Sequence, residues 1–221
     1  MKIPMNHAWN LSPRAAITLQ KELAAKVKMQ KPAHPIRVIA GVDCAPTKDK
    51  QSYRAAIVLW DLAKALPIET QYAEVSMTFP YIPGLLSFRE LPAVLAAVKS
   101  LRLEPDVFMV DGHGIAHPRK FGIAAHLGVL LDRPSFGCGK SLLYGHYEEP
   151  GLERGAMSPL LSKNGEVLGQ VLRTRNKVKP VIISVGHLMD LETAVALVLA
   201  TGKGYRLPEP TRIADRLVSQ R

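Results

Sequence analysis

The sequence predicts an α/β fold in which helices flank a mixed central sheet. Three strand-like runs joined by turns come first, and helical and strand-like runs alternate after them. Strands joined by tight turns pair antiparallel, whereas a crossover through a helix places its two strands parallel. The order of elements therefore requires a sheet that contains both kinds of pairing.

The amino-terminal part is expected to supply one helix and three strands. Ser12 followed by Pro13 is typical of a helix start, and apolar residues then recur every four positions, so a helix is expected over about residues 12–30. The strand-like runs cover residues 36–44, 53–60 and 68–78. Turn-forming residues separate these runs, which predicts an antiparallel meander.

After the meander, helices and strands alternate. Apolar residues at helical spacing predict a helix over residues 85–101, and the run at 106–111 is the next strand. We expect this strand to lie parallel to the strand at 36–43 and beside it. Further helices are expected at 121–131 and 191–201, strands at 134–137, 166–173 and 180–185, and a loop or inserted excursion at 144–164. Three antiparallel strands followed by this alternation are the pattern of a ribonuclease H-like fold.

Length and composition indicate one globular domain. The chain has 221 residues, of which 47% are hydrophobic and 22% charged, so it can bury a full core, and we expect a single domain over residues 1–221. Cys44 and Cys138 are the only cysteines, which excludes a disulfide framework and a four-cysteine zinc site. Neither a signal peptide nor an apolar run of membrane-spanning length is found, so a cytoplasmic protein is expected, with no membrane partner.

The net charge favours an anionic partner. The chain carries 29 Lys and Arg against 19 Asp and Glu, a formal charge of +10. Such an excess attracts phosphate polymers at long range. Because alkaline enzymes with other substrates share this balance, charge alone does not single out nucleic acid.

Two of the predicted strands end on a carboxylate. Asp43 closes the run Val-Ile-Ala-Gly-Val-Asp, and Asp111 closes the run Val-Phe-Met-Val-Asp. If the two strands are parallel, their carboxyl ends meet at the edge of the sheet where open α/β sheets bind ligands. Two carboxylates at close range repel each other unless a cation lies between them, and oxygen ligands favour Mg²⁺ or Mn²⁺. The alternative is that each aspartate only caps the loop after its strand.

Other polar residues follow the same strand ends. Glu90, at the start of the connecting helix, is a candidate third ligand, although an acid there also stabilises a helix start without any function. Lys140 follows the run Phe-Gly-Cys-Gly and can neutralise charge on a phosphate. In the loop after the second acid, Gly112 allows close approach to the backbone, while His117 and Arg119 are candidates to contact a ligand.

A proline-stiffened loop precedes the connecting helix. Its sequence is Pro80-Tyr81-Ile82-Pro83-Gly84. A stiff apolar wedge of this kind can enter a base step and take the place of a displaced base. The alternative is an ordinary turn into the helix, with Tyr81 packed against the protein.

From about residue 37 to its end, the chain resembles endonuclease V, a family of deoxyinosine-directed repair nucleases. The resemblance rests on the two acid-ended strands, the 80–84 loop with Leu-Leu-Ser-Phe-Arg-Glu90, the segment 105–119, Gly-Lys140-Ser, Ser-Val-Gly-His187 and the tail 203–212. Several long motifs in the same order make a specific signal. The chain departs from the family pattern at Cys44, where many relatives have another residue, and in the amino-terminal helix, but neither departure touches the acids.

The resemblance implies a ribonuclease H-like fold and cleavage of DNA that depends on Mg²⁺, with Mn²⁺ as a substitute. The cut is expected at the second phosphodiester bond on the 3′ side of a deaminated purine, with 3′-hydroxyl and 5′-phosphate ends. The implied catalytic residues are Asp43, Glu90, Asp111, Lys140 and His187, of which the three acids are metal ligands. Tyr81 matches the family's wedge, and Gly84, Gly112 and Gly122 match loops that line the pocket for the flipped base. Together with candidates from the residues alone, the expected DNA- or lesion-binding residues are Tyr81, Ile82, Pro83, Gly84, Gly112, His117, Arg119 and Gly122. Asp190 matches a family acid less securely and is a candidate only.

The expected partner is DNA with deaminated purines, bound by a monomer. Inosine in RNA is an alternative substrate, because a sequence does not reveal a contact to a 2′-hydroxyl group. A noncatalytic module for damaged DNA is a second alternative, in which the acids are structural. Addition of Mg²⁺, with a chelator as control, separates a nuclease from such a module.

Overall fold

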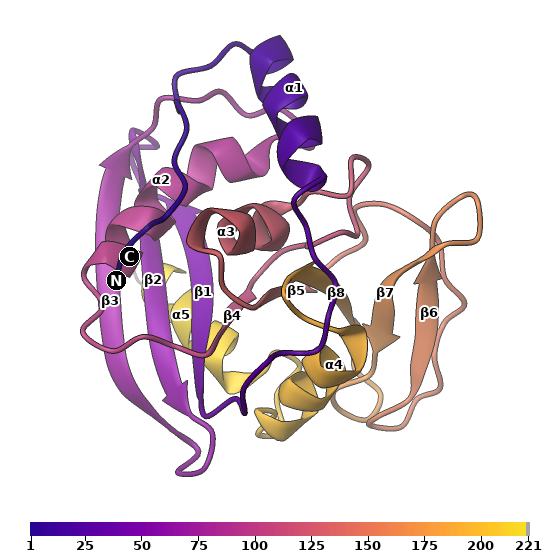
Figure 1. Cartoon of the computed structure of the whole chain (residues 1–221). Helices are drawn as coiled ribbons and strands as arrows, with labels where there is room; N and C mark the ends of the chain where they lie inside the picture. The colour runs from indigo at the N-terminus through magenta and orange to yellow at the C-terminus, as the bar shows by residue number, and fades with distance from the viewer. Residues whose placement is uncertain (220–221) are drawn as a thin grey trace.

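In the computed structural model, which describes residues 1–219, eight strands form one mixed sheet (Figure 1). The strand order is β3-β2-β1-β4-β5-β8-β7-β6. The strands are β1 (Val38–Pro46), β2 (Ser52–Asp61), β3 (Leu66–Ser76), β4 (Val107–Val110), β5 (Ser135–Gly139), β6 (Met157–Leu161), β7 (Val167–Leu172) and β8 (Val181–His187). The helices are α1 (Pro13–Ala24), α2 (Leu86–Lys99), α3 (Ile123–Leu131), α4 (Leu191–Ala200) and α5 (Glu209–Ser219).

The first three strands form the predicted antiparallel meander. β1 pairs with β2, and β2 pairs with β3. The apolar run of β2 is buried on both faces from Ala55 to Trp60, because helices cover both sides of this part of the sheet.

β1 and β4 are parallel neighbours, as predicted. Val42 is level with Val110 in the register, so the residues that follow them, Asp43 and Asp111, lie side by side where the pairing of β1 with β4 ends. The Asp111 amide also donates a hydrogen bond to the Val42 carbonyl at 2.9 Å, which extends the pairing to the acids themselves. The crossover rule therefore brings two carboxylates together from segments far apart in the chain.

Two helices cover each face of the sheet (Figure 1). α2 and α3 share one apolar core with β1, β2 and β4, in which Leu91 and Leu127 are fully buried. α4 lies on the opposite face with β5 and β8, and α5 packs there against β1 and β2. α1 lies outside α3, where Leu23 packs beside Phe121.

The structure corrects three sequence-based expectations. α1 ends at Ala24, so residues 25–30 are not helical. β6 lies inside the expected excursion at 144–164, and as an edge strand it tolerates Pro159 and buries only Leu160 completely. α5 was not predicted at all, although its alternation of buried and exposed residues is that of an amphipathic helix.

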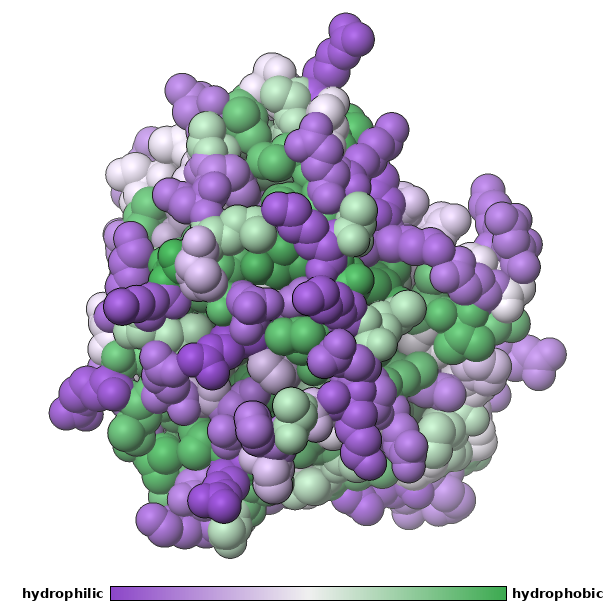
Figure 2. Space-filling view, in the orientation of Figure 1, coloured by the Kyte–Doolittle hydropathy of each residue, from purple (hydrophilic) through white to green (hydrophobic). Residues whose placement is uncertain are grey.

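The surface is mixed in character. In the view of Figure 2, hydrophilic side chains are spread over the whole face and divide the hydrophobic surface into small patches. Within residues 1–219, no helix has both the length and the apolar character needed to cross a membrane.

Candidate active site

Three aspartates meet where β1 and β4 end. Asp43 lies near the end of β1, Asp111 follows β4, and Asp215 comes from α5. One carboxylate oxygen from each residue lies within 4.8 Å of the other two. The two strand-end acids expected from the sequence therefore lie together, and α5 adds a third that the sequence analysis missed.

A glycine in β1 explains how α5 comes so close. A Cβ atom at Gly41 would lie 2.1 Å from the backbone carbon of Pro210, so only glycine lets the start of α5 rest on the strand. From this contact, β1 advances two residues to Asp43 while α5 advances five residues to Asp215, about 7 Å in each case. The strand and the helix thus deliver their carboxylates to the same place.

The buried acids disfavour their own charged forms. Burial and the nearby charge of Asp111 raise the pKa of Asp43 to about 8. Burial likewise raises the pKa of Asp111, an effect that Lys140 partly offsets. Glu90 is outside the group of three, yet its pKa is also raised to about 8 by burial and by the charges of Asp43 and Asp111. Four carboxyl groups in one electrostatic neighbourhood need a positive partner.

Lys140 supplies part of that positive charge. It follows β5, which lies parallel to β4, and its ammonium group is 2.6 Å from Asp111 Oδ2 and forms an ion pair with Asp215. Burial lowers the pKa of this ammonium, but the contacts with the two aspartates outweigh burial and hold the pKa above its ordinary value. Lys140 is therefore a firmly protonated cation within the cluster.

The donor set fits a divalent metal ion. Every ligand in the group is a carboxylate oxygen. Mg²⁺ and Mn²⁺ prefer such oxygen ligands, whereas Zn²⁺ does not depend on them. Asp111 Oδ2 is buried, and in the described chain no donor forms a hydrogen bond of good geometry with it, despite the short ion pair to Lys140. A carboxylate oxygen with one close cation and no other partner has a lone pair left for a metal ion.

A pocket of about 360 Å³ opens beside the acids. Asp111 and Lys140 form part of its wall. Seven of the eight expected lesion-binding residues line it, namely Tyr81, Ile82, Pro83, Gly84, Gly112, His117 and Gly122. The Tyr81 side chain is 68% exposed, so its ring is free to contact a ligand.

One glycine allows close packing beneath this pocket. A Cβ atom at Gly122 would lie 2.3 Å from the carbonyl oxygen of His113, so no other residue fits between α3 and the loop after β4. Gly122 is also the N-cap of α3, and its neighbour Ile123 lines the pocket. Gly122 thus lets the start of α3 pack tightly against the loop after β4 at the pocket wall.

The 80–84 loop is anchored from two sides. The carbonyl of Gly84 accepts hydrogen bonds from Gln20 Nε2 at 3.1 Å, Arg119 Nη2 at 2.7 Å and His117 Nε2 at 3.1 Å. Gln20 is buried in α1 and also donates to the Phe121 carbonyl at 2.8 Å, so α1 contributes to the pocket. Arg119 is the one expected residue that does not line the pocket: its guanidinium bonds the Gln20 side chain and the Gly84 carbonyl, and its contact with nucleic acid stays a prediction.

The structure does not bring His187 to the acids. β8 is antiparallel to β5, so His187 is level with Ser135 at one end of β5, whereas Lys140 follows the other end. The His187 ring accepts a hydrogen bond from the Lys28 amide at 3.2 Å and lies 3.3 Å from Asp132 Oδ1, in a separate pocket of about 370 Å³. The structure therefore places His187 apart from the acidic cluster, and its expected catalytic role stays a prediction.

The candidate Asp190 also has a local role. It is the N-cap of α4, and its carboxylate accepts hydrogen bonds from the amide and hydroxyl groups of Thr193 at 2.7 and 2.9 Å. These bonds satisfy the first turn of the helix, as N-cap residues do.

Sequence reasoning missed Asp215 and Gln20. Both are polar residues on helices with an apolar face, at positions where a side chain reaches a neighbouring element. A period of 3.6 residues places Asp215 on the turn that follows buried Thr211 and next to buried Ala214, which was an available signal.

Comparison with known proteins identifies close relatives. The family model for endonuclease V matches residues 21–216. The curated endonuclease V of Trichormus variabilis is 47% identical over 222 residues, which cover 100% of both chains. A solved endonuclease V from Streptomyces avermitilis superposes with a TM-score of 0.90 at 41% identity, covering 97% of this chain and 94% of that one. These likenesses confirm the predicted ribonuclease H-like fold.

A further solved relative carries nucleic acid. Endonuclease V of Ciona intestinalis was crystallised with a 24mer DNA that contains an inosine followed by a ribo-adenosine. It superposes with a TM-score of 0.80 at 26% identity, covering 93% of this chain and 95% of that one.

Proposed function

Because this chain belongs to the endonuclease V family of nucleases, we propose that it is a repair endonuclease directed at deoxyinosine in DNA. The proposed cut is at the second phosphodiester bond on the 3′ side of the lesion and leaves 3′-hydroxyl and 5′-phosphate ends. The observation that carries this proposal is the position of the acidic cluster at the wall of the pocket behind the 80–84 loop. The cytoplasmic location and the monomeric state stay predictions.

The proposed ligands of a Mg²⁺ ion are Asp43, Asp111 and Asp215. Glu90 is close enough to be affected by the charges of Asp43 and Asp111. When bound, the ion supplies an activated water and neutralises negative charge on the scissile phosphate. The three aspartates would hold the ion at the sheet edge, and the burial of Asp43 and Asp111 would limit competition from bulk water for their oxygens.

Lys140 is proposed to bind the scissile phosphate. Its ammonium lies between Asp111 and Asp215, on the wall shared by the cluster and the pocket. A cation at this position donates hydrogen bonds to a phosphate oxygen and stabilises the charge that grows there during cleavage. Its raised pKa keeps the proton on Nζ throughout the working pH range.

The pocket is proposed to receive the flipped hypoxanthine base. Tyr81, on the exposed tip of the 80–84 loop, would stack where the base has left the helix. Flipping costs a few kcal/mol and costs least for a mispaired base, which favours lesions over normal pairs. His117 is held neutral, because burial and the charge of Arg119 lower its pKa to about 4.

A mapped nicking assay tests the proposal. The wild-type chain is incubated with an end-labelled duplex that contains one deoxyinosine, with Mg²⁺ or with EDTA, beside an undamaged duplex of the same sequence. We expect one product, cut at the second bond on the 3′ side, in the Mg²⁺ reaction alone. A product with EDTA, a cut at another bond or equal cutting of both duplexes would contradict the proposal.

Inosine in RNA is a second candidate substrate. It is favoured by the ribo-adenosine that follows inosine in the nucleic acid bound to the Ciona intestinalis relative, since this nucleotide has a 2′-hydroxyl group. Matched DNA and RNA strands with inosine at one position, assayed in parallel under single-turnover conditions, decide which one is cut faster.

A further inference from the structure

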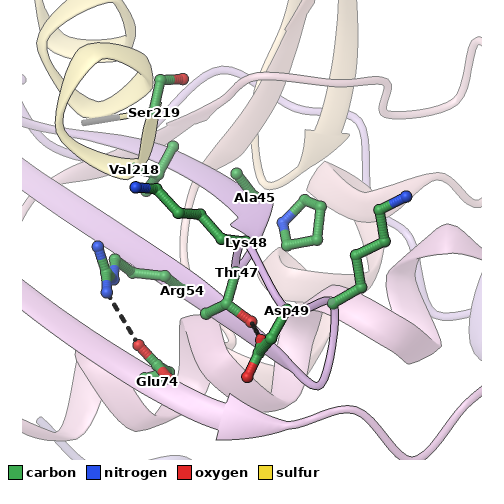
Figure 3. A pocket seen from close by; sticks show the side chains of 10 residues that line it. Ala45, Thr47, Lys48, Asp49, Arg54, Glu74, Val218 and Ser219 are labelled. Atoms are coloured by element: carbon green, nitrogen blue, oxygen red, sulfur yellow. Dashed lines mark hydrogen bonds and ion pairs between the residues drawn. The ribbon is translucent and has the colours of Figure 1, made fainter. Parts of the chain in front are cut away.

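A second and larger pocket lies at the same end of the sheet (Figure 3). Its volume is about 930 Å³, and none of the residues expected at the active site lines it. The walls come from the end of β1, the turn that joins it to β2, the neighbouring part of β2 and β3, and the end of α5. The lining residues are Ala45, Pro46, Thr47, Lys48, Asp49, Lys50, Arg54, Glu74, Val218 and Ser219.

This pocket begins directly beside the acidic cluster. Ala45 is two residues beyond Asp43, so both side chains point to the same face of β1, about 7 Å apart along the strand. On α5, Val218 and Ser219 lie one turn beyond Asp215, about 5–6 Å along the helix. The cluster thus lies between this pocket and the pocket behind the 80–84 loop.

Two cations at the pocket have no partner of their own. Lys48 and Lys50 are exposed, and neither forms an ion pair with any residue from 1 to 219. Arg54 is different, because it pairs with Glu74 on the adjacent strand at 3.1 Å, as Figure 3 shows. The carboxylate of Asp49 accepts hydrogen bonds from the Thr47 hydroxyl at 2.6 Å and the Gln51 amide at 3.1 Å, so it is engaged within the turn.

The rest of the lining offers few groups with which to read a base, because Thr47 and Arg54 are bonded to Asp49 and Glu74 and the Ser219 hydroxyl is the main polar group left. Ala45, Pro46 and Val218 are apolar, and the acids of the pocket are already bonded. Sequence-independent binding of a nucleic-acid backbone needs cations beside a smooth wall and no groups that discriminate between bases. A backbone that crosses the acidic cluster also needs nearby positive charge, because the carboxylates repel phosphates.

We propose that this pocket binds the phosphate backbone of the nucleic acid next to the segment held at the acidic cluster, through Lys48 and Lys50. The inference rests on the proposed function for the identity of the ligand. It adds a second contact region on the far side of the cluster from the lesion pocket. The contact is electrostatic and independent of the lesion.

The test is the salt dependence of DNA binding by the whole chain. Lys48→Gln with Lys50→Gln removes two charges and keeps side-chain length. The matched control is Lys64→Gln with Lys99→Gln, which removes two exposed lysines at the opposite end of the sheet. Binding to an inosine duplex and to an undamaged duplex is measured in EDTA by fluorescence anisotropy between 50 and 200 mM salt, a range over which roughly six to ten phosphate contacts change affinity by about 10³-fold or more.

Each lost phosphate contact lowers the slope of log affinity against log salt by about 0.9, so the pocket variant should lose about 1.8. The affinity for both duplexes should fall by the same factor, about 10-fold or more at the lowest salt, while the control keeps the wild-type slope. Equal losses in the two variants would show only a general effect of charge and would overturn the proposal. An unchanged slope in the pocket variant would overturn it as well.

Two further measurements keep the outcome clear. Lys48→Arg with Lys50→Arg should restore the slope, and melting curves should show that all variants are folded. Wild-type nicking of the inosine duplex tests the proposed function independently. If the wild type binds but does not nick, the proposed function fails while the slopes still decide the role of the pocket.

Discussion

At the scale of single residues, the acidic cluster lowers the stability of the folded protein when its carboxyl groups are charged. The pKa of Asp43 is about 8 in the folded chain against 3.8 for an ordinary aspartate, because burial and Asp111 oppose its charge. The folded state therefore holds the proton to higher pH than the unfolded state. The stability that this group contributes is complete below about pH 4 and is lost as the pH rises toward 8.

The first prediction concerns the metal-free protein, measured in the presence of a chelator. Asp43→Asn should raise the melting temperature at pH 8 by at least about 3 °C, since 1 kcal/mol shifts a chain of this size by about 2–4 °C. At pH 4 the difference from wild type should be close to zero. Thermal melts at both pH values, with exposed Glu148→Gln as the control, measure the effect; a variant less stable than wild type at pH 8 contradicts the electrostatic account.

The second prediction separates Asp215 from His187. Asp215→Asn should lower the single-turnover nicking rate by more than about 100-fold, beyond the 10-fold to 100-fold range of residues that only support ligands. His187→Gln should stay within about 5-fold of wild type, because the ring lies at the other end of β5. A loss in His187→Gln as large as that in Asp215→Asn, with an unchanged melting temperature, would restore His187 to the site.

Strand direction explains why sequence reasoning located Asp43 and Asp111 correctly and His187 incorrectly. The helical crossover through α2 makes β4 parallel to β3, and β3 is itself parallel to β1 in the meander, so the two aspartates follow parallel strands. His187 also ends a buried strand, but β8 runs antiparallel to β5, and the apolar run of a strand does not reveal its direction. Asp215 depends on the contact between Gly41 and Pro210, which no local pattern predicts.

At the scale of elements, α1 acts as a support for the lesion pocket. The buried side chain of Gln20 donates to the carbonyls of Gly84 and Phe121 and accepts a hydrogen bond from Arg119. It thereby ties the 80–84 loop to the start of α3 from outside the catalytic core. The resemblance noted in the sequence begins after this helix, so the residue that holds the loop belongs to the part of the chain that matched poorly.

The third prediction tests this support. Gln20→Leu keeps the approximate volume but leaves the carbonyls of Gly84 and Phe121 without one of their donors, at a cost of about 1–3 kcal/mol for buried groups. Affinity for the inosine duplex should fall more than affinity for the undamaged duplex, and the single-turnover rate at saturating enzyme should change little. Exposed Lys21→Met, on the same helix, is the control. Equal losses on both duplexes would limit Gln20 to a role in stability.

The strands and helices differ in how strongly their formation depends on tertiary contacts. The meander strands are long and separated by turn residues, and β4 is short but entirely apolar, so length and hydrophobic pattern identify them. β6 carries Pro159 and one fully buried side chain, so it exists as a strand because β7 is available as a partner. The helix expected to reach residue 30 ends at Ala24. Beyond it, the amides of Lys26 and Val27 donate hydrogen bonds to carbonyls three residues earlier, which closes the helix with a turn.

At the scale of the whole molecule, the acidic cluster separates two hollows of different chemistry. The pocket behind the 80–84 loop has glycine backbone and apolar walls suited to a base, and the pocket at Lys48 and Lys50 has free cations suited to phosphates. A single strand that enters both must cross the carboxylates where β1 and β4 end. This layout depends on helices packing on opposite faces of one sheet, so no single segment of the chain contains it.

A histidine pair centred on buried His126 is expected to make the fold sensitive to acid. His126 is fully buried on α3, and its Nε2 atom lies 2.8 Å from His7 Nε2, with one ring donating to the other. Ser87 contacts the remaining ring nitrogen at 3.0 Å, and the rings of Trp9 and Phe88 enclose the pair. Burial lowers the pKa of both histidines, and the positive charge of a protonated His7 would lower that of His126 further.

The fourth prediction follows from the lowered pKa values of these two histidines. Because these pKa values are lower in the folded than in the unfolded chain, the unfolded state binds more protons as the pH falls below 6.5. The stability contribution is therefore complete above pH 6.5 and is lost below it, at a rate of up to about 1.4 kcal/mol per pH unit for each histidine. His126→Gln should reduce the slope of the unfolding free energy between pH 6.5 and 5, measured by urea titration, while exposed His34→Gln should leave it unchanged. If both variants keep the wild-type slope, the His7 and His126 pair does not carry the acid sensitivity that its burial predicts.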